Sequence, residues 1–144
     1  MKISAKMEYA CVAMLELALQ YGSGKPVRIR WIADRHDVPS RFLVQILLEL
    51  KEAGLVTSVR GAAGGYQLRH PPGNISLGQV VDVIKGASRK DGQTTNASPD
   101  SNIVQVLQQI WNQVEAAERQ MLNDITLADL SQRARGQDEQ MDDI

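Results

Sequence analysis

The 144-residue sequence is poor in metal-binding side chains, with one cysteine, Cys11, and two histidines, His36 and His70. One thiol cannot form a disulfide within the chain, and with two imidazoles it supplies too few donors for a structural metal site. We therefore expect a reduced protein without metal or cofactor, and we expect both histidines at the surface.

Long apolar runs are also missing. No stretch approaches the roughly 18 apolar residues that a membrane span needs. No basic segment leads into an apolar stretch with a small-residue cleavage site, so no signal peptide is predicted. We expect a cytoplasmic protein with no membrane among its partners.

Groups for catalysis are equally scarce. The sequence offers no nucleophile paired with a base, no paired carboxylates and no nucleotide-binding loop. The glycine-rich segment 61–65 superficially resembles a phosphate cradle, but it leads into a strand pattern and lacks the lysine of such a loop. We expect that the protein is not an enzyme.

Charge is distributed unevenly, although the formal net charge is only -1. Residues 1–90 carry 13 Lys or Arg against 7 Asp or Glu, a net charge of +6, whereas residues 91–144 carry 3 against 10, a net charge of -7. A basic front half suits contact with nucleic acid, and an acidic back half suits a part that stays away from it.

Hydrophobic spacing predicts three helices in the first fifty or so residues. The first has apolar residues at three- and four-residue steps and ends near Gly22, and a short second helix covers residues 30–36. Pro39 fits the first position of a third helix, which extends to about Ala53. Its predicted core face is Leu43, Ile46, Leu47 and Leu50; that of the first helix is Met7, Ala10, Cys11, Met14, Leu15 and Ala18.

A hairpin and a fourth helix follow. Val56 and Val59, then Tyr66 and Leu68, indicate two short strands around the glycine-rich tip 60–65. Ser76 is a typical helix cap, and the helix after it ends at Gly86. Its predicted buried face is Leu77, Val80, Val81 and Ile84.

The remaining chain divides into a loop, a long helix and a tail. Residues 87–101 contain no large apolar side chain and predict a flexible loop. Residues 102–133 predict a long helix and a short terminal one capped by Thr126, and residues 134–144 an acidic, disordered tail. The long helix carries a seam of the kind that pairs with another helix, Ile103, Leu107, Ile110, Val114, Ala117 and Met121.

The order of these elements predicts a mainly α fold with a small β-hairpin wing, a winged helix-turn-helix over residues 1–86. Such a fold places its third helix in the major groove of double-stranded DNA. Ser40, Arg41 and Gln45, with Val44 beside them, lie where base edges are met, since Arg pairs with guanine and Gln with adenine. Lys51 suits a phosphate contact. On the wing, Arg60, Gly61 and Ala62 predict a second, minor-groove contact.

These segments resemble one family of bacterial regulators. The wing "GLVTSVRGAAGGYQL", the first helix "MKISAKMEYACVAMLELA" and the segment "LNDITLADL" are similar to the Rrf2 family, over about residues 1–133. The resemblance implies a homodimer held by the long helix, with both recognition helices and both wings reading a near-palindromic operator. The leading hypothesis is a repressor whose input is a small molecule, a partner protein, or its own concentration alone. The seam alone leaves open whether that helix packs on a second copy or on its own domain.

In one respect the sequence departs from this family. Relatives that sense iron, nitric oxide or redox state hold an iron-sulfur cluster with three cysteines in the segment that corresponds to residues 87–101, which here has none. We therefore carry over no cluster ligand, including Glu8, and expect a clusterless regulator. Cys11, on the apolar face of the first helix, is interpreted as structural; a thiol switch is its alternative.

A second class of function stays open beside DNA binding. The fold is also compatible with a protein-protein interaction module that no longer reads DNA. Steep dependence of duplex binding on salt distinguishes the two classes, because only the regulator neutralises phosphates. Trp31 and Trp111 are interpreted as packing residues, and Trp111 alternatively as part of a small pocket near the seam.

Overall fold

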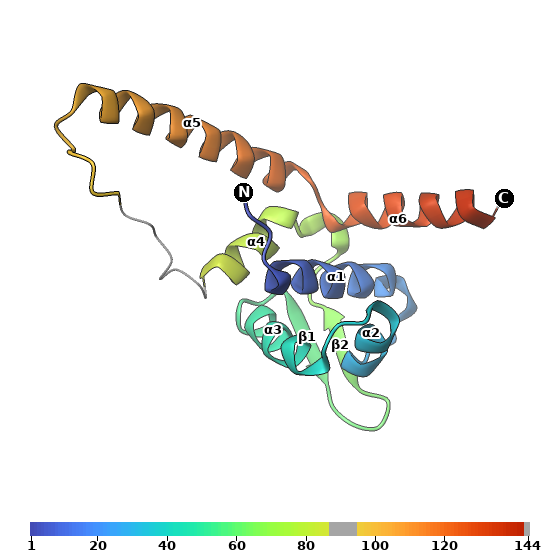
Figure 1. Ribbon diagram of the computed structural model, residues 1–144. Helices are drawn as coiled ribbons and strands as arrows, with labels where there is room; N and C mark the ends of the chain where they lie inside the picture. The colour runs from blue at the N-terminus through green and yellow to red at the C-terminus, as the bar shows by residue number, and fades with distance from the viewer. Residues whose placement is uncertain (87–94, 143–144) are drawn as a thin grey trace.

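The computed structural model describes residues 1–86 and 95–142. Within this part of the chain, helices dominate and the only sheet is a two-stranded antiparallel hairpin, which confirms the expected fold class (Figure 1). Short 3-10 turns occur at Tyr21–Ser23 and Pro72–Asn74. The main elements are α1 Ala5–Leu19, α2 Ile29–His36, α3 Ser40–Glu52, β1 Val56–Val59, β2 Gly65–Leu68, α4 Leu77–Gly86, α5 Asn102–Asp124 and α6 Leu127–Asp142.

Local signals explain most helix boundaries. The Ser4 hydroxyl caps α1 by accepting from the Met7 N–H at 3.1 Å. The Ser76 hydroxyl accepts from the Gln79 N–H at 3.1 Å, as expected for the start of α4. Pro39 is the extended residue before α3 and not its first helical residue, so α3 begins one position later than predicted. Either position suits proline, because neither needs its missing N–H.

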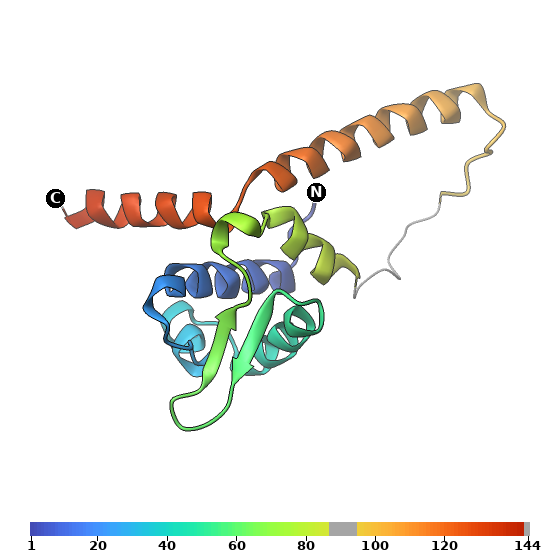
Figure 2. The ribbon, with the colours of Figure 1, turned by 180° about the vertical axis from the view of Figure 1, so that it is seen from behind.

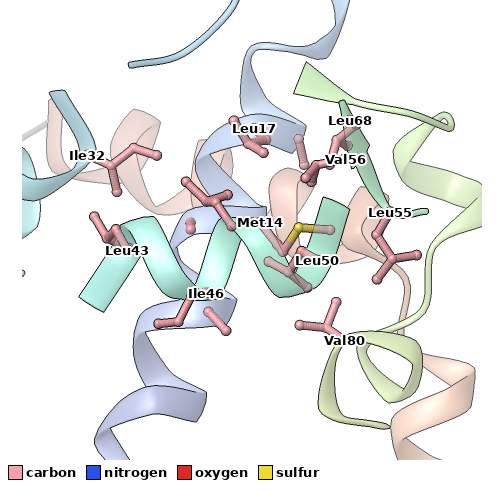
Figure 3. Close-up of a cluster of buried hydrophobic side chains, with 14 of the residues drawn as sticks. Met14, Leu17, Ile32, Leu43, Ile46, Leu50, Leu55, Val56, Leu68 and Val80 are labelled. Atoms are coloured by element: carbon pink, nitrogen blue, oxygen red, sulfur yellow. The ribbon is translucent and has the colours of Figure 1, made fainter. Parts of the chain in front are cut away.

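A single apolar core lies between α1, α3, the hairpin and α4 (Figure 3). All four residues predicted for the core face of α3 are buried, as are Val80, Val81 and Ile84 of α4. The face of α1 is only partly as predicted. Ala13 and Leu17 are buried, whereas Cys11 and Leu15 are half-buried. The reason is that α3, α4, α6 and β2 surround α1, so burial extends beyond one helical stripe.

The hairpin is short and carries an added backbone partner. Val56 pairs with Leu68 and Val59 with Gly65. Before α2, Val27 exchanges two backbone hydrogen bonds with Tyr66, of 2.9 and 2.8 Å. The wing is thereby joined to the start of the helix-turn-helix.

The chain beyond α4 leaves the body and returns to it. In both views, α5 projects from the body as a long rod while α6 lies across the end of the molecule near α1 (Figures 1 and 2). An antiparallel bridge between Ser76 and Thr126 ties the start of α4 to the start of α6. None of the helices in the described residues is long and apolar enough to cross a membrane.

The loop and tail predicted for the second half of the chain differ in outcome. Residues 87–94 of the predicted loop lie outside the described residues, and residues 95–101 contain no helix or strand. The prediction of a disordered tail from residue 134 is wrong up to Asp142, where α6 ends. Ala, Arg, Gln, Glu and Met in this stretch favour helix, and together they outweigh the unfavourable residues Gly136, Asp138 and Asp142.

Candidate nucleic-acid interface

The helix-turn-helix is built around a tight left-handed turn. Asp37 ends α2 with φ 54°, a conformation that aspartate tolerates better than most residues, and the Val38 N–H donates to the Ala33 carbonyl at 3.1 Å. Val38 is buried beneath the turn. The turn therefore fixes the angle at which α3 leaves α2.

The outer face of α3 carries the side chains predicted to read DNA. Ser40, Arg41, Gln45 and Lys51 are all exposed, on one helix whose opposite face is buried. The structure adds one apolar residue that the sequence analysis does not assign, Leu48, next to the Val44 already predicted at this surface. Leu48 is 43% exposed and Val44 is 52% exposed, so an apolar strip borders Gln45. The signal for Leu48 is its spacing, one turn after Val44.

Two contacts orient the polar side chains of this face. The Gln45 amide lies 3.5 Å from the Glu49 carboxylate, which accepts a 2.9 Å hydrogen bond from the Lys6 ammonium of α1. The Arg41 guanidinium lies 5.1 Å from the centre of the Phe42 ring, and that ring packs 6.0 Å from the ring of Tyr9. Arg41 and Gln45 are therefore held near the surface of α3 by neighbours that belong to α1 and α3.

The wing tip is exposed and sterically restricted. Arg60, Gly61 and Ala62 are all exposed. Gly61 has φ 108°, a conformation that other residues rarely adopt, and the Gly64 N–H closes the turn by donating to the Gly61 carbonyl at 3.0 Å. A Cβ at Gly64 would lie 2.1 Å from the Val59 carbonyl oxygen. The glycines thus permit a compact tip next to Arg60.

Arg28, which the sequence did not single out, also reaches this tip. It is the residue before α2, and its guanidinium Nη2 donates to the Ala62 carbonyl oxygen. The structure therefore brings together the wing tip and the start of the helix-turn-helix. Arg28 and Ala62 are 34 positions apart, and a backbone carbonyl leaves no mark in the sequence.

A buried carboxylate links α1 to α2. Glu16 is 4% exposed, and its Oε1 lies 2.6 Å from His36 Nε2 and 3.0 Å from Arg35 Nε. His36 is exposed, as the sequence predicts, and its ring also contacts this carboxylate. The pair holds the end of α2 against α1, behind the face that presents α3.

The predicted seam of α5 is exposed in the single chain. Its large apolar residues Ile103, Leu107, Ile110, Val114 and Met121 are between 45% and 73% exposed, and Trp111 beside them is 61% exposed. Ala117 is also exposed.

A different side of α5 faces its own domain. Arg119 donates to the Asp82 carboxylate of α4 at 2.9 Å, the Met1 amine lies 3.4 Å from Glu118, and Leu122 packs at the edge of the core. At about 100° per residue, these α5 residues lie between roughly a sixth of a turn (Glu118) and nearly half a turn (Arg119) from the centre of the seam. The seam is therefore available to another molecule.

Cys11 lies partly buried on α1. Burial, and secondarily the Glu8 carboxylate, raise the pKa of the Cys11 thiol to about 11. Among the described residues, no three His, Cys, Asp or Glu side chains are arranged to hold a metal ion.

Comparison with known proteins identifies the fold. A sequence profile described as "Rrf2: Iron-dependent Transcriptional regulator" matches residues 3–133. A putative HTH-type transcriptional regulator of Synechocystis is 36% identical over 94% of this chain and 90% of its own. The HTH-type transcriptional regulator CymR of Bacillus subtilis is 32% identical over 96% of both chains.

Solved structures agree. The structure of CymR, the global cysteine regulator of B. subtilis, superposes with a TM-score of 0.78 at 32% identity, covering 92% of this chain and 98% of CymR. T. potens IscR superposes with a TM-score of 0.75 at 34% identity, covering 93% and 88%. With the helix-turn-helix, the glycine-tipped wing and the long α5 in place, the chain belongs to the Rrf2 family of transcriptional regulators.

Proposed function

We propose that the protein is a sequence-specific DNA-binding transcription regulator that represses its targets as a homodimer on a near-palindromic operator. One observation carries this proposal. The exposed face of α3 and the tip of the wing lie at the end of the molecule opposite α5 and α6 (Figure 1). The acidic half of the chain is thereby kept away from the phosphates.

Each predicted contact has a chemical role in this proposal. Arg41 pairs with the O6 and N7 of a guanine and Gln45 with the N6 and N7 of an adenine in the major groove. Val44 and Leu48 supply apolar contact, for example with a thymine methyl group. Lys51, near the other end of α3, contacts a phosphate.

The wing supplies the second groove contact. Arg60 is placed to enter a narrow minor groove, where the negative potential attracts its guanidinium. Gly61 and Ala62 beside it are small enough for their backbone to approach the sugar-phosphate wall. The two contacts lie on separate elements, so specificity requires that both be held in place.

The exposed seam supports a dimer built on α5. In an antiparallel pairing of two copies, its spacing sets Ile103 against Met121, Leu107 against Ala117 and Ile110 against Val114 of the second copy. A two-fold axis then passes near the middle of α5. Two-fold symmetry in the protein predicts two half-sites separated by about one helical turn of DNA, roughly 34–36 Å, or a multiple of it.

An iron-sulfur cluster does not fit the donor set of this chain, although the family profile is described as iron-dependent. Clusters need thiolate ligands, and the whole sequence holds one cysteine. That cysteine is half-buried on α1 and its pKa is raised, which favours the neutral thiol. We therefore propose a cytoplasmic regulator without a cluster, whose input is a small molecule, a partner protein, or its own concentration alone.

One experiment tests these points together. Protein purified without oxygen is examined for visible absorption and iron content, and the same sample is used to select bound fragments from a fluorescent pool of genomic DNA. A colourless, iron-free protein that enriches a palindrome supports the proposal. A brown, iron-containing protein overturns the proposal of a clusterless regulator. A colourless protein that enriches no sequence overturns DNA reading and favours an interaction module.

A further inference from the structure

We infer that Arg28 is a positioning residue that holds the wing tip in the conformation needed for its DNA contact. This inference rests on the proposed DNA-binding function and concerns the same interface. It assigns to a residue outside both α3 and the wing the task of placing Arg60.

The backbone next to Arg28 is already fixed against the base of the wing. Val27 exchanges its two hydrogen bonds with Tyr66 on β2, immediately before Arg28. The approach is so close that a Cβ at Gly65 would lie 2.4 Å from the Val27 carbonyl oxygen and 3.1 Å from the Arg28 nitrogen. The Arg28 side chain therefore starts from a rigid point at the wing.

From this point the guanidinium reaches the tip. Its Nη2 donates to the carbonyl oxygen of Ala62, two residues after Arg60. Among the described residues, the tip is otherwise closed by the backbone bond from Gly64 to Gly61. Arg28 thus supplies the side-chain bond that connects the tip to the helix-turn-helix.

The composition of the tip explains why such a bond matters. Residues 61–65 are only glycine and alanine, so they have almost no side-chain surface to pack and would lose much conformational freedom on binding DNA. A tip ordered before binding avoids that loss at the moment of association. Removing the Arg28 side chain should therefore weaken binding even if Arg28 never touches DNA.

A direct phosphate contact by Arg28 is the competing role, and salt dependence separates the two. Removing one side chain that neutralises a phosphate reduces the slope of log affinity against log salt by about one. A positioning residue changes operator affinity only by placing Arg60, and it contacts no phosphate itself. Its effect should therefore disappear once Arg60 is removed.

The test compares Arg28→Ala, Arg60→Ala and the double variant for operator affinity across a salt titration. Arg30→Ala, which removes an exposed arginine two positions away, is the matched control. We expect Arg28→Ala to lower affinity by about tenfold with an unchanged salt slope, and by less than about twofold in the Arg60→Ala background. A slope reduced by about one, with an equal decrease of affinity in both backgrounds, would overturn positioning in favour of a phosphate contact.

A second readout needs no DNA. Trypsin cuts after Arg60, so the rate of cleavage there, identified by mass, reports how often the free wing opens. We expect Arg28→Ala to increase this rate several-fold while Arg30→Ala leaves it unchanged, with equal thermal midpoints. An unchanged rate overturns the inference. Wild-type protein that binds no DNA overturns the proposed function instead, and cleavage still tests Arg28.

Discussion

Single side chains on α3 and the wing differ in how they are supported. Gln45 is in contact with Glu49, which is itself bound by Lys6, so its amide is guided by a network from α1. Arg60 is exposed, and the support of the wing tip comes from Arg28 through Ala62. A base contact depends on both the reading group and its support, so the two residues should respond differently to changes around them.

We expect Gln45→Ala and Arg60→Ala each to weaken operator binding by ~1 to 3 kcal/mol, because each removes a contact to a base or groove wall. The measurement is fluorescence anisotropy on the selected operator at fixed salt. Gln132→Ala, which changes an exposed residue of α6, is the control and should bind as the wild type does. Unchanged affinity in both variants contradicts the assigned interface.

Cys11 should resist alkylation in the native protein. A rise in pKa from 9.0 to about 11 reduces the thiolate population at neutral pH by about 100-fold. We expect iodoacetamide to modify native protein far more slowly than urea-unfolded protein. A native alkylation rate close to that of the unfolded protein would show a reactive thiol and would favour the alternative that Cys11 is a thiol switch.

The same shift affects stability at high pH. The protonated thiol is favoured in the folded state, so its contribution is complete below the ordinary pKa of 9.0 and is lost as pH rises through about 11. We expect the urea midpoint to fall over this range less in Cys11→Ala than in the wild type. Parallel pH profiles for the two proteins would contradict the predicted contribution.

Some of these residue assignments could be predicted from the sequence and others could not. Exposure of Arg41 and Gln45 follows from helical spacing, since Leu43 and Ile46 occupy the core face. The roles of Arg28 and Glu16 depend on partners brought close only by folding. Glu16 lies on α1 at a position that faces α2. A single carboxylate within a helical sequence does not indicate that it will be buried against another helix.

At the scale of elements, close backbone approach joins the wing to the helix-turn-helix. Gly65 is the point of contact, because the Val27 carbonyl occupies the space that a Cβ would need. The isolated bridge between Val27 and Tyr66 depends on this approach. The wing is therefore an element supported from two sides, by β1 and by the segment before α2.

Gly65→Ala should separate these elements. The methyl group would overlap backbone atoms, which cannot move aside as a flexible side chain can, so we expect a loss of unfolding free energy of ~1 to 3 kcal/mol and weaker operator binding. Gly22→Ala is a matched control, since no atom lies within 4 Å of its added Cβ. Urea denaturation and anisotropy measure the two effects. Equal stability of both variants would contradict the close approach.

Element boundaries were predictable where capping residues mark them. Ser76 and Thr126 each cap the helix that follows, and both helices begin where the sequence predicts. The end of α6 was not predictable in the same way, because Gly136 and the acidic residues after it indicate fraying. Packing of α6 on α1 and good helix formers in the last turns favour helix instead.

At the scale of the whole molecule, the two charge regions occupy different ends. The wing and α3 lie on one side of α1, whereas α5 and α6 lie on the other (Figures 1 and 2). Repulsion between the acidic half and DNA phosphates is therefore weakened by distance. The same arrangement leaves the seam of α5 free to meet a second copy without covering α3.

Ile110→Asp should convert the dimer to a monomer. A carboxylate at the centre of the seam would be buried without a partner in the dimer, while in the single chain the site is exposed and the fold is kept. Light scattering after gel filtration measures the mass, and circular dichroism checks the helices. Gln109→Asp, which places the same charge on another side of α5, should stay dimeric.

Operator binding by the same pair links assembly to function. We expect Ile110→Asp to lose most of its affinity for the full palindrome while keeping weak affinity for a single half-site. A variant that remains dimeric, or a wild type that is monomeric at micromolar concentration, contradicts the α5 interface.

The bridge between Ser76 and Thr126 gives the chain a further property. α4 begins and α5 ends beside this bridge, where Leu77 and Leu127 are each held by a backbone bond, to Ile125 at 2.7 Å and to Ile75 at 2.9 Å. Insertions or deletions between α4 and α5 therefore need not shift the frame of the wing or of α6. The length of the connection between α4 and α5 can therefore vary during evolution. A sensor peptide could likewise be inserted near residues 95–98 without moving the wing.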